Sequence, residues 1–161
     1  MSPKPAGDTA IAGFLPACRS ADIGTDFLSF ITPKDDSRAA AAAIAEARAC
    51  VERFSRAFNS EDVAGMDREL HFPHTLFSPG SRLVWRTPGQ HPADLFEALR
   101  RVGWTKSVYV SIEPLLAAAD KVDFVVSYER QDSAGRVISQ HKNLWIVTRE
   151  DGRWGIALRS Y

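Results

Sequence analysis

Residues 122–128 (VDFVVSY), 137–147 (VISQHKNLWIV) and 154–158 (WGIAL) are three apolar runs that decide the fold. Only two short clusters that contain glycine separate them, at residues 132–135 and 150–152. Connections this short join antiparallel strands, because parallel strands need a crossover of about a dozen residues or more. The region from Val108 to Tyr161 therefore predicts one antiparallel meander.

Amphipathic helices are predicted upstream of this meander. The first has a stripe of apolar residues spaced three and four apart, namely Ile44, Ala47, Val51, Phe54 and Phe58. Ser60 is placed to cap a second helix, and Pro92 is placed to begin a third. The predicted helices span residues 37–58, 60–70 and 92–102.

A first hairpin is predicted between the second and third helices, where residues 75–77 and 82–86 flank the turn Ser78-Pro79-Gly80. The economical architecture is an α+β fold. In it, three N-terminal-side helices pack on a strongly curved, mainly antiparallel sheet and enclose an internal pocket. The sequence divides into an N-terminal extension at residues 1–36, expected to be loosely ordered, and one domain at residues 37–161.

Composition excludes some classes of partner. The 20 lysines and arginines balance 20 aspartates and glutamates, and no basic block is present, which disfavours nucleic acid and anionic membranes as partners. No stretch approaches the roughly 20 apolar residues of a membrane span. Of the two cysteines, Cys18 and Cys50, the second falls on the predicted buried stripe. Reduced thiols and a cytoplasmic location are expected.

Three motifs carry a resemblance to a known family: Phe54–Asp62 (FSRAFNSED), His71–His74 (HFPH) and Asp151–Trp154 (DGRW). With the order of elements over residues 37–161, they resemble the nuclear-transport-factor-2-like superfamily, which includes ketosteroid isomerases, scytalone dehydratases and polyketide cyclases. The resemblance implies a conical α+β fold with an apolar pocket. It implies no particular reaction, because the superfamily hosts many unrelated activities.

The resemblance can be tested against the ketosteroid isomerases, which use a tyrosine, an aspartate base and a second acid. Matching the motifs places Phe54, Ser78 and Leu144 at these three positions. Such residues cannot form a proton-transferring base with an oxyanion hole of two acidic donors. The chain is therefore not expected to be an isomerase of that type.

His74 is the candidate base, because it lies next to Thr75 on a predicted strand, although a structural role fits it equally well. His71 is expected to face solvent or the last carbonyls of a helix. Two histidines three residues apart in an extended segment that contains Pro73 point to opposite faces. No cluster of Cys, Asp or Glu joins them, so no metal site is predicted.

The pocket is expected to be apolar with a few polar anchors. The predicted ligand-binding residues are Phe54, Phe58, His74, Leu76, Trp85, Tyr128 and Asn143. Further candidates for pocket hydrogen bonds are Tyr109, Glu113, His141 and Arg159. No cofactor is predicted, because the sequence has no phosphate-binding glycine-rich loop.

Three functions remain open at this point. We favour a protein that binds a small lipophilic molecule. The alternatives are a lyase, isomerase or hydrolase that acts on a lipophilic ring compound with His74 as base, and a non-catalytic protein-interaction module. Apolar residues occupy both faces of one strand, with Trp145 and Val147 opposite Leu144 and Ile146. This pattern predicts a homodimer that forms through the outer face of the sheet.

Overall fold

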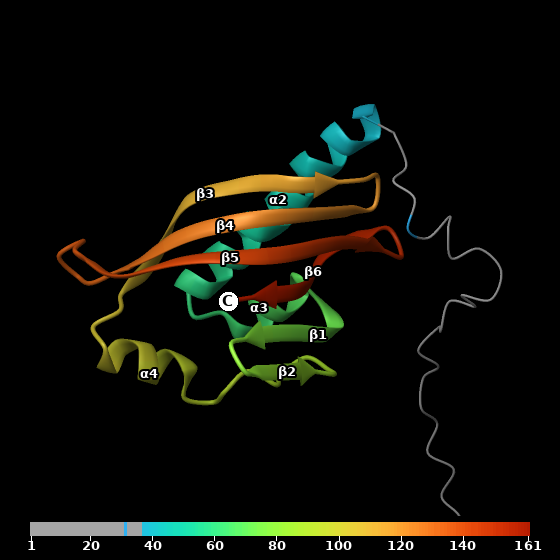
Figure 1. The fold of residues 1–161 in the computed structure, drawn as a ribbon. Coiled ribbons are helices and arrows are strands. Elements are labelled where there is room, and N and C mark those ends of the chain that lie inside the picture. The colour runs from blue at the N-terminus through green and yellow to red at the C-terminus, as the bar shows by residue number, and fades with distance from the viewer. Residues whose placement is uncertain (1–30, 32–36) are drawn as a thin grey trace, which may run out of the picture. The chain divides into compact units, whose positions relative to one another are not determined.

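A computed structural model of the chain describes residue 31 and residues 37–161, so the predicted extension lies almost entirely outside the described residues. The domain consists of helices packed on a six-stranded sheet that is not closed into a barrel (Figure 1). Its elements in chain order are α2 (Ser37–Asn59), α3 (Val63–Arg68), β1 (Leu70–Ser78), β2 (Ser81–Trp85), α4 (Leu95–Arg101), β3 (Lys106–Ala117), β4 (Lys121–Gln131), β5 (Val137–Glu150) and β6 (Arg153–Ser160).

The sheet has the strand order β2-β1-β6-β5-β4-β3, with edges at β2 and β3. Neighbouring strands are antiparallel except β1 and β6, which are parallel. The predicted meander is confirmed as β3 to β6, and the predicted hairpin is confirmed as β1 and β2. The predicted α+β class with a mainly antiparallel sheet is likewise confirmed.

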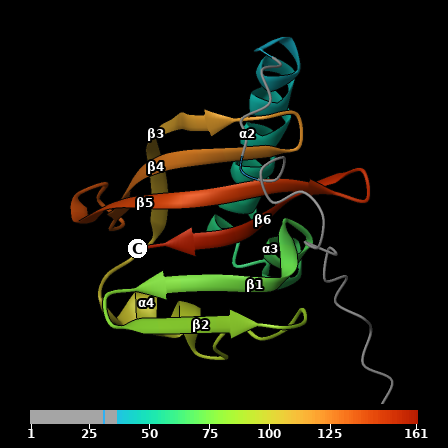
Figure 2. The ribbon, with the colours of Figure 1, turned by 45° about the vertical axis from the view of Figure 1, so that its right-hand side comes forward.

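The long helix α2 crosses one face of the sheet (Figures 1 and 2) and contacts β3, β4 and β6. Its predicted apolar stripe is buried at Ala47, Val51 and Phe54, and the Cys50 side chain lies among them. Burial raises the pKa of the Cys50 thiol to about 12, so this cysteine packs as a small apolar side chain.

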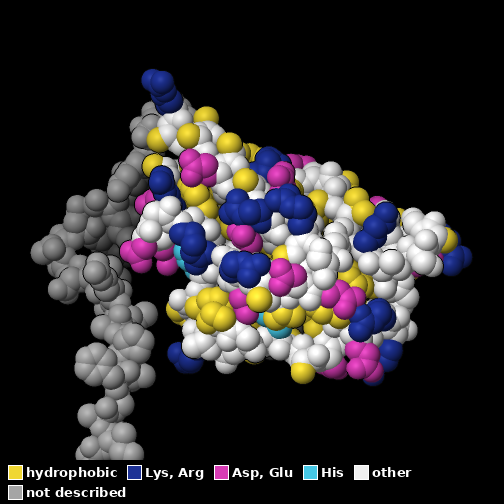
Figure 3. Space-filling view, turned by 180° about the vertical axis from the view of Figure 1, so that it is seen from behind, with side chains coloured by type: hydrophobic (Ala, Val, Ile, Leu, Met, Phe, Trp, Pro, Cys, Tyr) yellow, Lys and Arg dark blue, Asp and Glu magenta, His cyan; other side chains and the backbone are white. Residues whose placement is uncertain are grey.

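Seen from the helical side, the surface carries interspersed side chains of both charges (Figure 3).

The end of α2 is tied to the edge strand β3. The Asn59 amide donates to the carbonyl of Ser107 at 2.8 Å and accepts from the amide N–H of Ser107 at 2.8 Å. Glu61 then takes a positive φ of 55° and reverses the chain. Asp62, rather than the expected Ser60, caps α3, because its carboxylate accepts from the N–H of Gly65 at 2.8 Å.

Two predicted helices are shorter than expected. Leu70 was expected to end the second helix, but it begins β1, because pairing with Ile156 of β6 extends the chain there. The third helix begins at Leu95 after Asp94, and Pro92 lies in the preceding turn, where its carbonyl accepts from the N–H of Leu95. Tertiary pairing and a local turn therefore override the helical pattern at these ends.

The core lies between α2 and the inner face of the sheet. In the central strands, the apolar side chains that fill the core are Val122, Phe124, Val126, Trp145 and Val147. Leu144 and Ile146 point to the other face and are half-buried in the single chain. A homodimer through that face stays a prediction.

The imidazole of His71 packs directly on the backbone of Gly155, where any larger residue would collide with it. It is buried, its Nε2 lies 3.1 Å from the carbonyl of Thr148, and Arg153 donates to its Nδ1 at 2.9 Å. The expected position in solvent or at a helix end is therefore wrong, because Leu70 and His71 belong to β1. A Cβ atom at Gly155 would lie 2.7 Å from Cδ2 of the imidazole.

Replacing Gly155 with alanine should destabilise the fold by about 1–3 kcal/mol, because the added methyl group overlaps a ring that two hydrogen bonds hold in place. Urea unfolding followed by tryptophan fluorescence measures this change. In a His71→Ala background the same replacement should cost under about 1 kcal/mol, since the overlap is gone. Equal costs in the two backgrounds would show that the overlap with His71 is not the cause.

Candidate functional site

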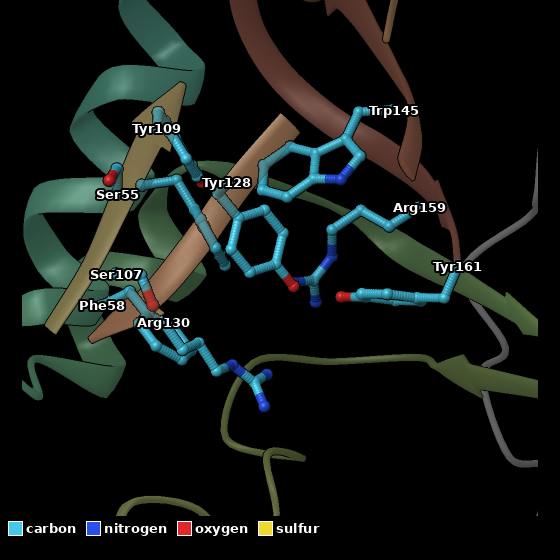
Figure 4. A pocket seen from close by; sticks show the side chains of 10 residues that line it. Ser55, Phe58, Ser107, Tyr109, Tyr128, Arg130, Trp145, Arg159 and Tyr161 are labelled. Atoms are coloured by element: carbon cyan, nitrogen blue, oxygen red, sulfur yellow. The ribbon is translucent and has the colours of Figure 1, made fainter. Parts of the chain in front are cut away.

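A cavity lies between α2 and the inner face of the sheet. It holds about 380 Å³ of space unfilled by protein atoms, part of it open to solvent. Figure 4 shows its lining side chains, which come from α2, β3, β4, β5 and β6 and from the end of the chain. They are Phe54, Ser55, Phe58, Ser107, Tyr109, Tyr128, Arg130, Trp145, Arg159 and Tyr161.

Aromatic rings form most of the cavity wall. Trp145 meets Phe54 edge-on at 5.5 Å and Tyr109 at 6.1 Å between ring centroids, and Tyr109 meets Tyr128 at 5.8 Å. Phe58 packs edge-on against Phe96 of α4 at 5.3 Å, so α4 closes the wall at one end. Edge-to-face contacts of this kind are a favourable arrangement of aromatic rings and stabilise the packing of the wall.

Arg159 is a buried cation inside this aromatic wall, with 5% of its surface exposed. Its guanidinium carbon lies 4.9 Å from the ring centroid of Phe54, 5.6 Å from Trp145 and 5.9 Å from Tyr161. Figure 4 shows the guanidinium group pointing toward the hydroxyl of Tyr128 and the ring of Tyr161. No ion pair within residues 37–161 includes this arginine.

His74 accepts a hydrogen bond from the guanidinium group of Arg159. The Nε of Arg159 donates to Nε2 of the imidazole at 3.1 Å, and the imidazole Nδ1 lies 2.9 Å from the carbonyl oxygen of Ile156. An arginine only donates and a carbonyl only accepts, so the hydrogen of the neutral ring is on Nδ1. Burial, with the nearby Arg159 charge, lowers the pKa of His74 from 6.5 to about 3.

Two other buried donors around the cavity have no partner among the described residues. They are the Nε of Arg130 and the indole N–H of Trp145. Burial also raises the pKa values of Tyr109 and Tyr128, so both hydroxyls keep their protons near neutral pH. The site therefore presents hydrogen-bond donors on an apolar wall.

The structure brings only part of the predicted ligand site together. Phe54, Phe58 and Tyr128 line the cavity, and whether they bind a ligand stays a prediction. The other four predicted ligand-binding residues are not among its lining residues: His74, Leu76, Trp85 and Asn143.

His74 lies behind the cavity wall rather than at its polar end, because its ring is fully buried between β6 and Trp85. Trp85 packs against His74 at 5.7 Å and against His91 at 4.3 Å between ring centroids. Leu76 pairs with Arg159 in the register of β1 and β6. Leu76 and Trp85, which were expected to line the cavity, therefore pack in the core beneath Arg159.

The positions matched to the ketosteroid isomerase residues are dispersed. Phe54 lines the cavity, Ser78 is exposed at the end of β1, and Leu144 points to the outer face. Of the other hydrogen-bond candidates, Tyr109 and Arg159 line the cavity, Glu113 is exposed, and His141 stacks on Tyr128 at 4.7 Å.

Besides His74 and Arg159, the domain has another pair of polar side chains that the sequence did not predict. His91 and Asp67 are nearly buried, and Nε2 of His91 lies 3.1 Å from Oδ1 of Asp67 without the alignment of a hydrogen bond. Burial lowers the pKa of His91 although the Asp67 carboxylate opposes the shift. The pair is separated from Arg159 by the Trp85 ring, which both His91 and the guanidinium group contact.

Five cavity residues were not expected as ligand residues, namely Ser55, Ser107, Arg130, Trp145 and Tyr161. Arg130 carried a readable signal, because it continues the inward alternation of Val126 and Tyr128 in β4. A charged residue on an inward-facing position is unusual and marks a candidate site.

Solved structures of similar fold are known, although no protein-family model and no curated protein matches the sequence. A ketosteroid isomerase-like protein from Erwinia carotovora atroseptica is 20% identical with a TM-score of 0.54, over 72% of this chain and 92% of that one. A protein of unknown function with a cystatin-like fold from Nostoc punctiforme is 13% identical with a TM-score of 0.59, over 74% and 90%. An NTF2-like protein of unknown function from Pseudomonas putida is 16% identical with a TM-score of 0.57, over 74% and 85%.

These likenesses show that the chain has the nuclear-transport-factor-2-like, or cystatin-like, fold, which confirms the expected architecture. At such low identity they show the fold alone. Within the described part of the chain, no three His, Cys, Asp or Glu residues are grouped as metal ligands. No described helix is long and apolar enough to cross a membrane.

Replacing His74 with glutamine should flatten the pH dependence of stability. Between about pH 6.5 and about pH 3 the unfolded chain binds a proton on His74 that the folded chain does not, so the free energy of unfolding falls as pH is lowered through this range. Without the imidazole, the slope should decrease by up to about 1.4 kcal/mol per pH unit. Urea titrations at several pH values measure both slopes. Identical slopes would refute a neutral, proton-resistant His74.

Proposed function

We propose that this chain binds a small molecule in the cavity between α2 and the sheet and does not catalyse a reaction on it. The observation that carries the proposal is the composition of the wall, which joins rigid aromatic rings to a few hydrogen-bond donors. Small-molecule sites are typically apolar clefts with few polar anchors. The enclosed part of this cavity is small, about 50 Å³, so a bound molecule is compact or extends into the open side.

The same wall argues against an enzyme. The ten lining residues, all from the described domain, include no Asp, Glu or His. A general base must reach the reacting proton directly or through one water molecule. Arginine stays protonated, and the pKa values of Tyr109 and Tyr128 are raised rather than lowered. His74, the expected base, has both ring nitrogens engaged and a pKa of about 3.

The fold supports a pocket as the functional part of the chain. A ketosteroid isomerase-like protein shares the fold, but its name concerns that protein. In this chain the cavity wall includes Phe54, Trp145 and the buried Arg159. These groups can hold and orient a ring compound, which is consistent with binding.

A neutral fluorescent probe tests the proposed function. N-phenyl-1-naphthylamine, which becomes bright in apolar sites, should bind saturably at one site per chain. In Ser55→Phe the new ring should occupy the cavity and weaken binding at least about tenfold, since each 1.4 kcal/mol of lost contact is tenfold in affinity. Fluorescence titration measures both dissociation constants.

The matched control is Glu52→Phe, which adds the same ring at an exposed position of α2. It should bind the probe like the parent protein, and circular dichroism should show that both variants fold. If the parent protein does not bind the probe saturably, or if Ser55→Phe binds it unchanged, the cavity is not the binding site.

A further inference from the structure

We infer that the ligand of this cavity carries a single anionic group, a carboxylate on an apolar body, and that Arg159 binds it. The inference rests on the proposed function and names its ligand class. It starts from the one charged side chain that is both deeply buried and part of the cavity wall.

Arg159 has unused hydrogen-bonding capacity. Its Nε donates to His74, and this is the one hydrogen bond that the guanidinium group makes within residues 37–161. The two terminal nitrogens therefore remain for a ligand, and together they match the two oxygens of a carboxylate. The rings of Phe54, Trp145 and Tyr161 surround the cation and reduce the cost of its burial, but none of these residues accepts a hydrogen bond from it.

Two other polar groups of the wall have the same preference, whereas the serine and tyrosine hydroxyls of the wall can either donate or accept. Arg130 and Trp145 each present a buried N–H without a protein partner, and neither group can accept a hydrogen bond. A ligand rich in acceptors satisfies these donors, whereas a cation would be repelled by two arginines. Leaving such donors buried without a partner is unfavourable.

His74 acts here as a positioning residue. Because its ring is neutral and Nδ1 is held by the carbonyl of Ile156, Nε2 is a fixed acceptor for the Nε of Arg159. The guanidinium plane is therefore oriented before a ligand arrives, and little ordering is needed on binding. A charged imidazole in this place would instead repel the arginine.

The aromatic wall and the small volume restrict the rest of the ligand. An enclosed space of only about 50 Å³ between aromatic rings suits a compact ring or short aliphatic body. Of the two arginines in the wall, only Arg159 is buried and matches one negative charge, whereas Arg130 is partly exposed, so its charge is screened by solvent. An aromatic monocarboxylate therefore fits better than a phosphate ester with two charges.

Benzoate and benzamide test this inference, because they have nearly the same shape and differ in charge. In isothermal titration calorimetry near pH 7, the parent protein should bind benzoate at least about tenfold tighter than benzamide, the scale of a hydrogen bond to a charged group. Arg159→Gln should remove this preference, because it weakens the binding of benzoate much more than that of benzamide.

Two further variants complete the design. Arg130→Gln, at a half-buried position that is easier to replace, should weaken benzoate at least about threefold more than it weakens benzamide. The matched control is Arg136→Gln, whose guanidinium group pairs with Asp132 in an exposed turn outside the cavity and should change neither affinity. If Arg159→Gln does not fold, Arg130→Gln provides the decisive comparison.

The outcomes separate this inference from the proposed function. If benzoate fails to bind or binds no better than benzamide, while the neutral naphthylamine still binds in a manner sensitive to Ser55→Phe, the anionic ligand class is wrong and the binding function stands. If the arginine variants weaken both probes equally, the arginines are structural and the inference is overturned. If none of the three probes binds in the cavity, the proposed function itself fails.

Discussion

The hydrogen bond from Arg159 to the neutral ring of His74 connects the core of this domain to its cavity. One ring nitrogen of the histidine is held by the backbone of β6, and the other holds the arginine. A guanidinium group cannot lose its proton, so the histidine must stay neutral for both to be buried together. The parallel pairing of β1 with β6 brings the two side chains together, and the rings around the cavity then pack against the cation.

The cavity persists because of the kind of side chains that surround it. Aliphatic side chains rotate and fill gaps, whereas rings in edge-to-face contact have few alternatives in a packed interior. Phe54 and Trp145 meet in this way across the space between α2 and the sheet. The two hydrogen bonds between Asn59 and Ser107 fix the end of α2 against β3, so the helix and the sheet cannot move freely toward each other. The shape of the cavity is thus set by rings on α2 and β5, whereas its charge is set by Arg159 on β6.

The fold could be predicted from the sequence to a large extent, because its signals are local. Short turns between apolar runs required antiparallel strands, and the stripe that ends at Phe54 and Phe58 required a helix. Helix ends were less predictable. Leu70 belongs to β1 rather than to the predicted helix because it pairs with Ile156, and no local pattern reveals this pairing. The position of His74 behind the wall followed from the same long-range pairing.

Arg159 was a candidate for a pocket hydrogen bond, but the alternation of β6 did not predict that it faces the cavity. Strict alternation from Trp154 and Ile156 places Arg159 on the outer face. The register between β5 and β6 shifts, however, because Ile146 pairs with Leu158 and Val147 pairs with Ile156. The extra residue, Ala157, is a β-bulge, and it reverses the alternation so that Arg159 faces inward. No composition or spacing signal marks this bulge in the sequence.

The bulge has a consequence for how such a site can change over time. Side-chain direction in a strand depends on counting, so the gain or loss of a bulge has a larger effect there than the exchange of one residue. If β6 were regular with Ala157 still present, alternation would turn Ser160 toward the cavity and Arg159 toward the opposite face of the sheet. A change that flattens the bulge could thereby exchange a cationic wall for a neutral one while the surrounding rings stay in place. In a lineage of such domains, the presence or absence of this bulge in β6 would mark the boundary between ligand classes.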